Sequence, residues 1–169
     1  MPQKPRSPED EHEFAEMLSN VNVIFIGMQV LILLDMSYMS RFWTQTEAWM
    51  SMQDASTSGL ATASEGRRRY TIVPLHNASA KLSEMLVDMW AGKSAKEAHA
   101  ILAQPDVLVT NQSDKDRQLP KILKLNEASK RTLEAYAELE SGMQCLARAV
   151  AAKDSPDLTA ALLVAEKAG

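Results

Sequence analysis

The stretch Val30-Leu31-Ile32-Leu33-Leu34-Asp35-Met36-Ser37-Tyr38 contains the segment that decides the fold. Five consecutive aliphatic residues are followed by an acid and by small polar residues. A run this short, with one helical pattern before it and another after it, is typical of a central parallel strand covered on both faces. We therefore expect residues 30–34 to form a buried strand that ends at Asp35.

The residues before this strand predict a helix. Ser7-Pro8-Glu9-Asp10 provides a capping serine, a proline at the first helical position and acids in the first turn. Apolar residues then recur at helical spacing as far as Gly27, a residue type that often ends helices. We expect a helix over residues 8–27 and a disordered tail over residues 1–6.

The residues after the strand alternate between helical and extended patterns. We expect helices over 37–53, 82–90 and 95–102, further strands over 70–75 and 107–110, and loops over 55–66 and 111–117. Alternation of this kind implies right-handed crossovers and a parallel sheet. Arg67-Arg68-Arg69 precedes the second strand; such a run can contact a phosphate, but at a junction of this kind it is more often solvated.

A long helical pattern dominates the C-terminal part. It runs from Leu119 to Ala152, with Pro120 in its first turn and Gly142 as a point of division, and a last helix is expected over 158–168. The chain is thus expected to be an α/β core over residues 7–118, with a small parallel sheet of about three strands flanked by helices, followed by a helical extension over residues 119–169.

Composition excludes several classes of function. The chain has 169 residues, enough for one domain, and a formal net charge of -4, which provides no global basic field for nucleic acid. Cys145 is the single cysteine, so no internal disulfide and no multi-cysteine metal site can form. His12, His76 and His99 lack metal-ligand spacing. We expect no metal site and no required cofactor.

The most apolar stretch, residues 21–34, is too short for a membrane helix, which needs about 20 residues. Acids at Glu9 to Glu13 interrupt the N-terminal region where a signal peptide would have its apolar segment. We expect a cytoplasmic protein without a membrane span. Ten methionines, an unusual number, favour either a pliable core or an apolar contact surface.

The helix after the first strand carries a candidate acid. With Trp43 at zero and 100° per residue, Met50 lies about 20° to one side and Glu47 about 40° to the other, whereas Arg41 lies about 160° away. Glu47 therefore shares the apolar face, and Arg41 cannot easily pair with it along this helix. Burial would raise the Glu47 pKa, which suits acid–base work in a cleft. The alternative is a half-exposed glutamate at the edge of the stripe.

Polar residues follow each predicted strand. Ligands collect at the carboxyl ends of parallel strands, and the first two strands lead into Asp35, Ser37 and Tyr38 and into His76 and Asn77. Thr110, Asn111 and Asp114 follow the third. These ends are consistent with one binding site, although every strand of such a sheet also has to leave through a polar loop.

Tyr38, Trp43 and Glu47 resemble the tyrosine, tryptophan and glutamate of TIR domains, at the same spacing after a strand. The pattern Tyr-x-Ser-Arg-x-Trp, followed by Gln and Glu, is also similar to the heterokaryon-incompatibility domain, which is itself TIR-like. The resemblance covers about residues 10–92 and lacks the first strands of the family. It implies a flavodoxin-like sheet, with Glu47 as the catalytic carboxylate that cleaves the nicotinamide–ribose bond of NAD.

The resemblance leaves three functions open. The first is a TIR-like signalling or assembly module that acts through protein partners or self-association, since missing strands leave a sheet edge that invites pairing. The second is an NAD-binding or NAD-cleaving domain with NAD as substrate. Its catalytic residue would be Glu47, and the nucleotide would contact Asp35, Ser37, Tyr38, Trp43, His76 and Asn77. The third is an inactive fragment of a larger TIR-like protein.

Overall fold

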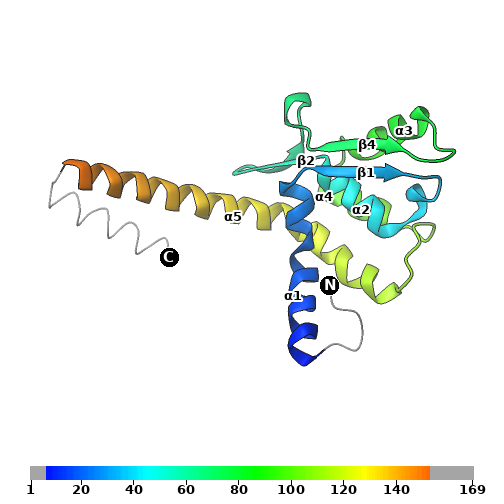
Figure 1. Cartoon of the computed structure of the whole chain (residues 1–169), viewed down its shortest axis with the longest axis horizontal. Helices are drawn as coiled ribbons and strands as arrows, with labels where there is room; N and C mark the ends of the chain where they lie inside the picture. The colour runs from blue at the N-terminus through cyan, green and yellow to red at the C-terminus, as the bar shows by residue number, and fades with distance from the viewer. Residues whose placement is uncertain (1–6, 153–169) are drawn as a thin grey trace.

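The computed structural model describes residues 7–152, and Figure 1 shows their arrangement. The predicted tail 1–6 and the predicted last helix 158–168 lie outside the described residues. The elements are α1 (Pro8–Gly27), β1 (Val30–Leu34), η1 (Tyr38–Ser40), α2 (Phe42–Ser51), β2 (Gln53–Ser56), β3 (Gly59–Thr62), η2 (Glu65–Arg67), β4 (Tyr70–Pro74), α3 (Ala80–Trp90), α4 (Ala95–Leu102) and α5 (Gln112–Ala152).

The predicted start of the first helix is confirmed. Ser7 caps α1 through a capping box: Ser7 Oγ accepts a hydrogen bond from the Asp10 N–H at 3.1 Å, and the Ser7 N–H donates to Asp10 Oδ2 at 3.1 Å. The helix ends at Gly27, as expected. Ser94 and Glu97 form the same device at the start of α4. Because these caps satisfy free backbone N–H groups locally, their sequence signature is dependable.

The fold is mixed α/β, with a parallel sheet smaller than expected. β1 pairs in parallel with β4, so that Leu31 lies opposite Thr71 and Leu33 opposite Val73. The predicted third strand is reduced to a single parallel bridge between Leu108 and Arg41. The Leu108 main chain pairs with the start of α2 instead of with the sheet, which therefore has two strands rather than about three.

The expectation that β1 is covered on both faces is wrong. Ile32 and Leu34 are buried, but Leu31 and Leu33 are 61% and 50% exposed. The inner face of the sheet packs against side chains of α2, α3, α4 and α5, among them Trp49, Leu86, Trp90, Leu102 and Ile122. The outer face of β1 thus remains open to solvent among the residues described.

A small antiparallel hairpin, β2–β3, begins at Gln53, where the predicted helix 37–53 was expected to end, and continues with a 3-10 turn into the predicted loop 55–66. Sequence reasoning missed the hairpin because its strands have only four residues each and lack the alternation that marks a half-buried strand. Gly59 allows the tight turn, with a φ of +110° that side-chain-bearing residues rarely adopt. Both strands of the hairpin pack on α5.

α5 is longer at its start than predicted. It begins at Gln112, because Asn111 Oδ1 accepts hydrogen bonds from both the main chain and the hydroxyl of Ser113. The predicted loop 111–117 is therefore mostly helical, Pro120 lies inside the helix, and Gly142 does not divide it. The expected boundary at residues 118 and 119 falls within α5.

The first half of α5 packs on α4 and the hairpin, whereas its distal half projects from the body (Figure 1). This arm exposes apolar side chains at alternating spacings of three and four residues, namely Tyr136, Leu139, Met143 and Val150 together with the half-buried Leu146. None of the helices in residues 7–152 combines the length and apolarity needed to cross a membrane.

Candidate functional site

The carboxyl end of β1 is built around Asp35. Its Oδ1 accepts hydrogen bonds from the Ser37 N–H at 3.0 Å and from Ser37 Oγ at 2.9 Å. Arg41 Nη2 lies 3.4 Å from the same oxygen and forms an ion pair. The Ser37 hydroxyl, assisted by the Arg41 charge, lowers the pKa of Asp35. A fixed carboxylate therefore closes the turn between the strand and the next helix.

Tyr38 follows on η1 and points into the core. Its side chain is buried, and its carbonyl accepts a hydrogen bond from Thr44 Oγ1 at 2.8 Å. Burial, together with the nearby charge of Glu47, raises the pKa of Tyr38 far above that of a free phenol. Tyr38 is thus a neutral, anchored residue beside Glu47.

The helical extrapolation does not describe the position of Arg41. α2 begins at Phe42, and Arg41 has extended backbone angles of -96° and 126°, so a helical wheel does not apply to it. Its positive charge opposes the rise that burial causes in the pKa of both Tyr38 and Glu47. As expected, Arg41 forms no ion pair with Glu47 among the described residues, but its charge still acts on Asp35, Tyr38 and Glu47.

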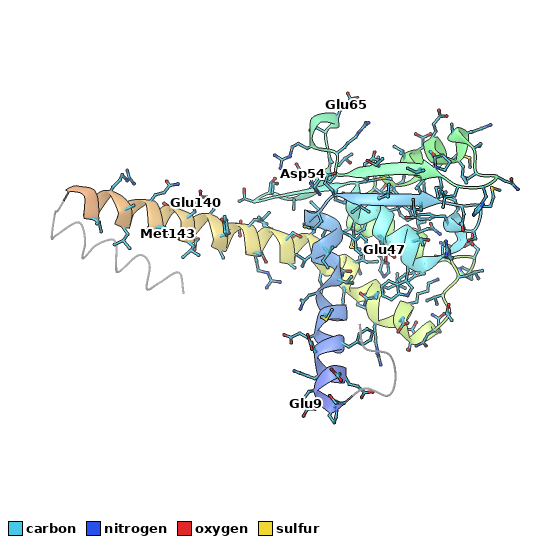
Figure 2. The ribbon with its side chains drawn as sticks, viewed as in Figure 1. Glu9, Glu47, Asp54, Glu65, Glu140 and Met143 are labelled. Carbon is cyan, nitrogen blue, oxygen red and sulfur yellow. The ribbon has the colours of Figure 1, made fainter. Side chains whose placement is uncertain are left out.

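Glu47 is half-buried on α2 (Figure 2). Burial raises its pKa, and Arg41 opposes this rise. Within residues 7–152 its carboxylate forms no hydrogen bond and no ion pair. The buried face of α2 centres on Phe42, Gln45, Thr46 and Trp49, so Trp43 and Glu47 lie at its edge. Glu47 is thus a half-exposed glutamate at the edge of the apolar face, the second of the two predicted alternatives. Its carboxylate is still partly shielded from water, which raises its pKa.

His76 and Asn77 lie at the same edge of the sheet, after β4. The Leu75 N–H donates to the Leu34 carbonyl at 2.8 Å, which brings the two strand ends together. Both side chains are exposed, and His76 has a φ of +53°. No hydrogen bond or ion pair in the described part of the chain links them to Asp35. The structure therefore brings Asp35, Tyr38 and Glu47 together around Arg41, whereas His76 and Asn77 lie at the same sheet edge without a hydrogen bond or ion pair to Asp35 in this part of the chain.

Lys115 is a buried cation that sequence reasoning missed. Residues 111–117 were expected to be a solvated loop, yet Lys115 is 5% exposed. Its Nζ donates to the carbonyls of Gln104 and Val107 at 2.7 and 2.9 Å and lies 5.9 Å from the centre of the Phe42 ring. The capping pattern at Asn111 is the signal that would have placed Lys115 on a helix.

The methionines divide between core and surface. Met50 and Met52 are almost fully buried, whereas Met28 and Met36, on either side of β1 in the sequence, are 61% and 66% exposed. Methionines therefore occur both in the core, at the C-terminal end of α2, and on the surface beside β1.

In residues 7–152 no three His, Cys, Asp or Glu side chains are grouped as metal ligands. Comparisons with protein-family models, with curated proteins and with solved structures find no match for this chain. The resemblance to TIR domains accordingly stays a prediction from Tyr38, Trp43 and Glu47.

Proposed function

We propose that this protein is a TIR-like assembly module that works through protein contacts, self-association first among them. The observation that supports this proposal is the open outer face of the β1–β4 sheet. Leu31, Leu33 and Val73 project from this face and are 61%, 50% and 39% exposed.

Such a sheet is incomplete by itself. Parallel sheets are normally covered on both faces, and two strands alone are marginally stable in water. Burial of one Leu side chain contributes roughly 1.5–3 kcal/mol, so a partner that covers this face gains several such contributions. In the described residues β1 and β4 each pair on one side only, which leaves main-chain edges for an added strand.

The test is the molar mass in solution over a range of protein concentrations, measured by light scattering after size exclusion. We expect the wild type to associate and Leu33→Lys to be monomeric. Leu139→Lys, which changes another exposed leucine on the α5 arm, should associate as the wild type does. Loss of association in Leu139→Lys alone would move the interface to α5. A wild type that stays monomeric at every concentration rejects self-association.

A second candidate is NAD binding or cleavage, favoured by the desolvated and unpaired carboxylate of Glu47 beside Tyr38 and Arg41. In this proposal Asp35, Ser37, Trp43, His76 and Asn77 contact the nucleotide. The test is NAD consumption by purified protein, with Glu47→Gln as the variant. No turnover in the wild type, or equal turnover in the variant, rejects the catalytic role. A monomer without turnover is the result expected of an inactive fragment.

A further inference from the structure

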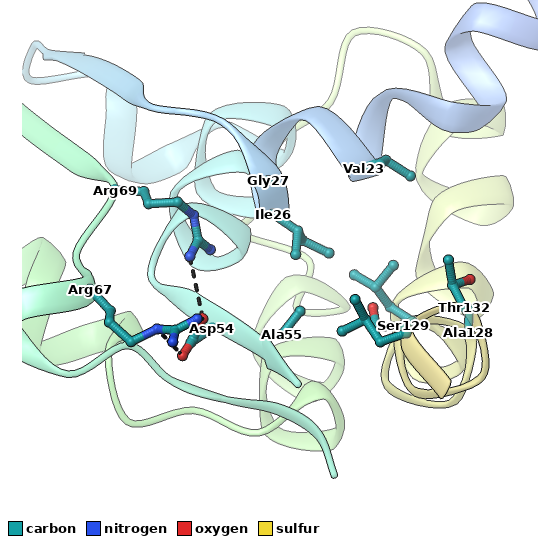
Figure 3. Close-up of a pocket in the computed structure, with 12 residues that line it drawn as sticks. Val23, Ile26, Gly27, Asp54, Ala55, Arg67, Arg69, Ala128, Ser129 and Thr132 are labelled. Carbon is teal, nitrogen blue, oxygen red and sulfur yellow. Dashed lines mark hydrogen bonds and ion pairs between the residues drawn. The ribbon is translucent and has the colours of Figure 1, made fainter. Parts of the chain in front are cut away.

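A half-open cavity of about 360 Å³ lies between the end of α1, the hairpin and the first half of α5 (Figure 3). None of the residues predicted to bind or cleave a nucleotide lines it. Its apolar wall consists of Val23, Ile26, Ala55, Leu125, Ala128 and Leu133. These side chains come from three separate elements, so the cavity is a product of tertiary packing.

One end of the cavity carries a net positive charge. Arg67 binds Asp54 through two contacts, Nε to Oδ2 at 2.7 Å and Nη2 to Oδ1 at 3.0 Å, and Arg69 Nη1 lies 3.5 Å from Oδ1 (Figure 3). Two guanidinium groups thus share one carboxylate. Both arginines and Asp54 line the cavity, so its polar end has a formal charge of +1.

Arg69 retains an unused donor. Its Nη2 donates to the Gln53 carbonyl, but its Nε is buried and has no hydrogen-bond partner. A buried, unpaired donor on a charged group is costly, and a bound acceptor would remove that cost. The third arginine of the run, Arg68, is exposed and lies outside the cavity lining.

We propose that this cavity binds a free medium-chain carboxylate, with the carboxylate at Arg67 and Arg69 and the chain against the apolar wall. Small-molecule sites are mostly apolar, contain a few placed polar groups and have volumes of about 300–1,000 Å³. The cavity is at the lower end of this range, which favours one unbranched chain. The excess positive charge selects an anion over a neutral amphiphile. This proposal is independent of the assembly function.

The competing explanation is that Arg67 and Arg69 only join the hairpin to the start of β4 through Asp54. Calorimetric titration of the wild type with decanoate and with decanol, both below their aggregation concentrations, separates the two explanations. We expect saturable binding of one decanoate and binding of decanol weaker by at least about tenfold, because a charge-assisted hydrogen bond is lost. Absence of saturable decanoate binding, or equal affinity for decanol, overturns the proposal.

Variants locate the site. Arg67 is largely exposed, so Arg67→Met is expected to fold and to bind decanoate about tenfold more weakly, whereas Arg68→Met removes the same charge outside the cavity and should bind normally. Ala128→Phe, at an exposed helical position in the lining, should abolish binding by filling the space for the chain. Equal weakening by Arg67→Met and Arg68→Met, or normal binding by a folded Ala128→Phe protein, overturns the proposal. Circular dichroism melts verify that each variant is folded.

Discussion

The Asn126 side chain of α5 lies directly against Gly59 at the turn of the hairpin. Asn126 Oδ1 accepts a hydrogen bond from the Leu60 N–H at 2.8 Å, and a β-carbon at Gly59 would lie 2.5 Å from that same oxygen. Gly59 also has a φ of +110°. The hairpin therefore docks on α5 through a contact that favours glycine at position 59.

Gly59→Ala should therefore destabilise the fold. The left-handed backbone and the close approach of Asn126 both oppose a β-carbon, and we expect a loss of about 1–3 kcal/mol in the free energy of unfolding, measured by urea denaturation. Gly92→Ala is the matched control, since a β-carbon there meets no atom within 4 Å. Equal losses in the two variants would show that the contact with Asn126 carries no special cost.

Lys115→Met should destabilise the connection between α4 and α5. The substitution removes two hydrogen bonds from a buried cation and leaves the carbonyls of Gln104 and Val107 without their donor. We expect a loss on the order of 3 kcal/mol in the free energy of unfolding. Arg117→Met, an exposed cation two residues away, should change it by less than about 0.5 kcal/mol. A comparable loss in both variants contradicts the role assigned to the Lys115 ammonium group.

Local signals account for the parts of the fold that the sequence predicts well. The capping boxes at Ser7 and Ser94 use contacts within three residues, β1 coincides with a short aliphatic run, and β4 contains the β-branched residues Thr71, Ile72 and Val73. Leu108 shows where such reasoning fails. The apolar residues around Leu108 resemble a strand, but the main chain of Leu108 pairs with Ser40 and Phe42. These partners are far away in the sequence, so the pairing cannot be predicted from the neighbouring residues.

The candidate site shows the same division. The order of Asp35, Tyr38 and Glu47 along the chain predicts that they follow a strand, and they do. The position of Arg41 was not predictable, because it depends on the residue at which α2 begins. The cavity was missed altogether, since Asp54 belongs to a hairpin that was not predicted and its arginine partners are 13 and 15 residues further along the chain.

Replacement of Arg41 should change the titration of two acids. Because the Arg41 charge lowers the pKa of both Glu47 and Asp35, Arg41→Gln should raise both values. The measurement is an NMR titration of the side-chain carboxyl carbons. Arg117→Gln is the control, because Arg117 is not among the charges that act on either acid. Unchanged titration of Glu47 in Arg41→Gln would mean that Arg41 does not act on the candidate catalytic group.

Glu47→Gln should stabilise the protein at neutral pH. Burial raises the Glu47 pKa above its ordinary value of 4.5, so its contribution to stability is complete below that value and is lost as the pH rises through the folded-state pKa. Glutamine resembles the neutral carboxyl and removes this loss. The melting temperature of Glu47→Gln should therefore exceed that of the wild type at pH 7, and the difference should shrink towards pH 4.

Glu97→Gln provides a control of opposite sign. Hydrogen bonds from Ser94 lower the Glu97 pKa, so its stabilising contribution is present above pH 4.5 and is lost as the pH falls through the folded-state value. This variant should melt below the wild type at pH 7 and approach it in acid.

The melting temperature of Glu47→Gln decides what the Glu47 carboxylate does. If Glu47→Gln melts below the wild type at pH 7, the Glu47 carboxylate is a stabilising group. If it melts above, the fold keeps a carboxylate at a cost in stability, as is expected of a group retained for binding or chemistry.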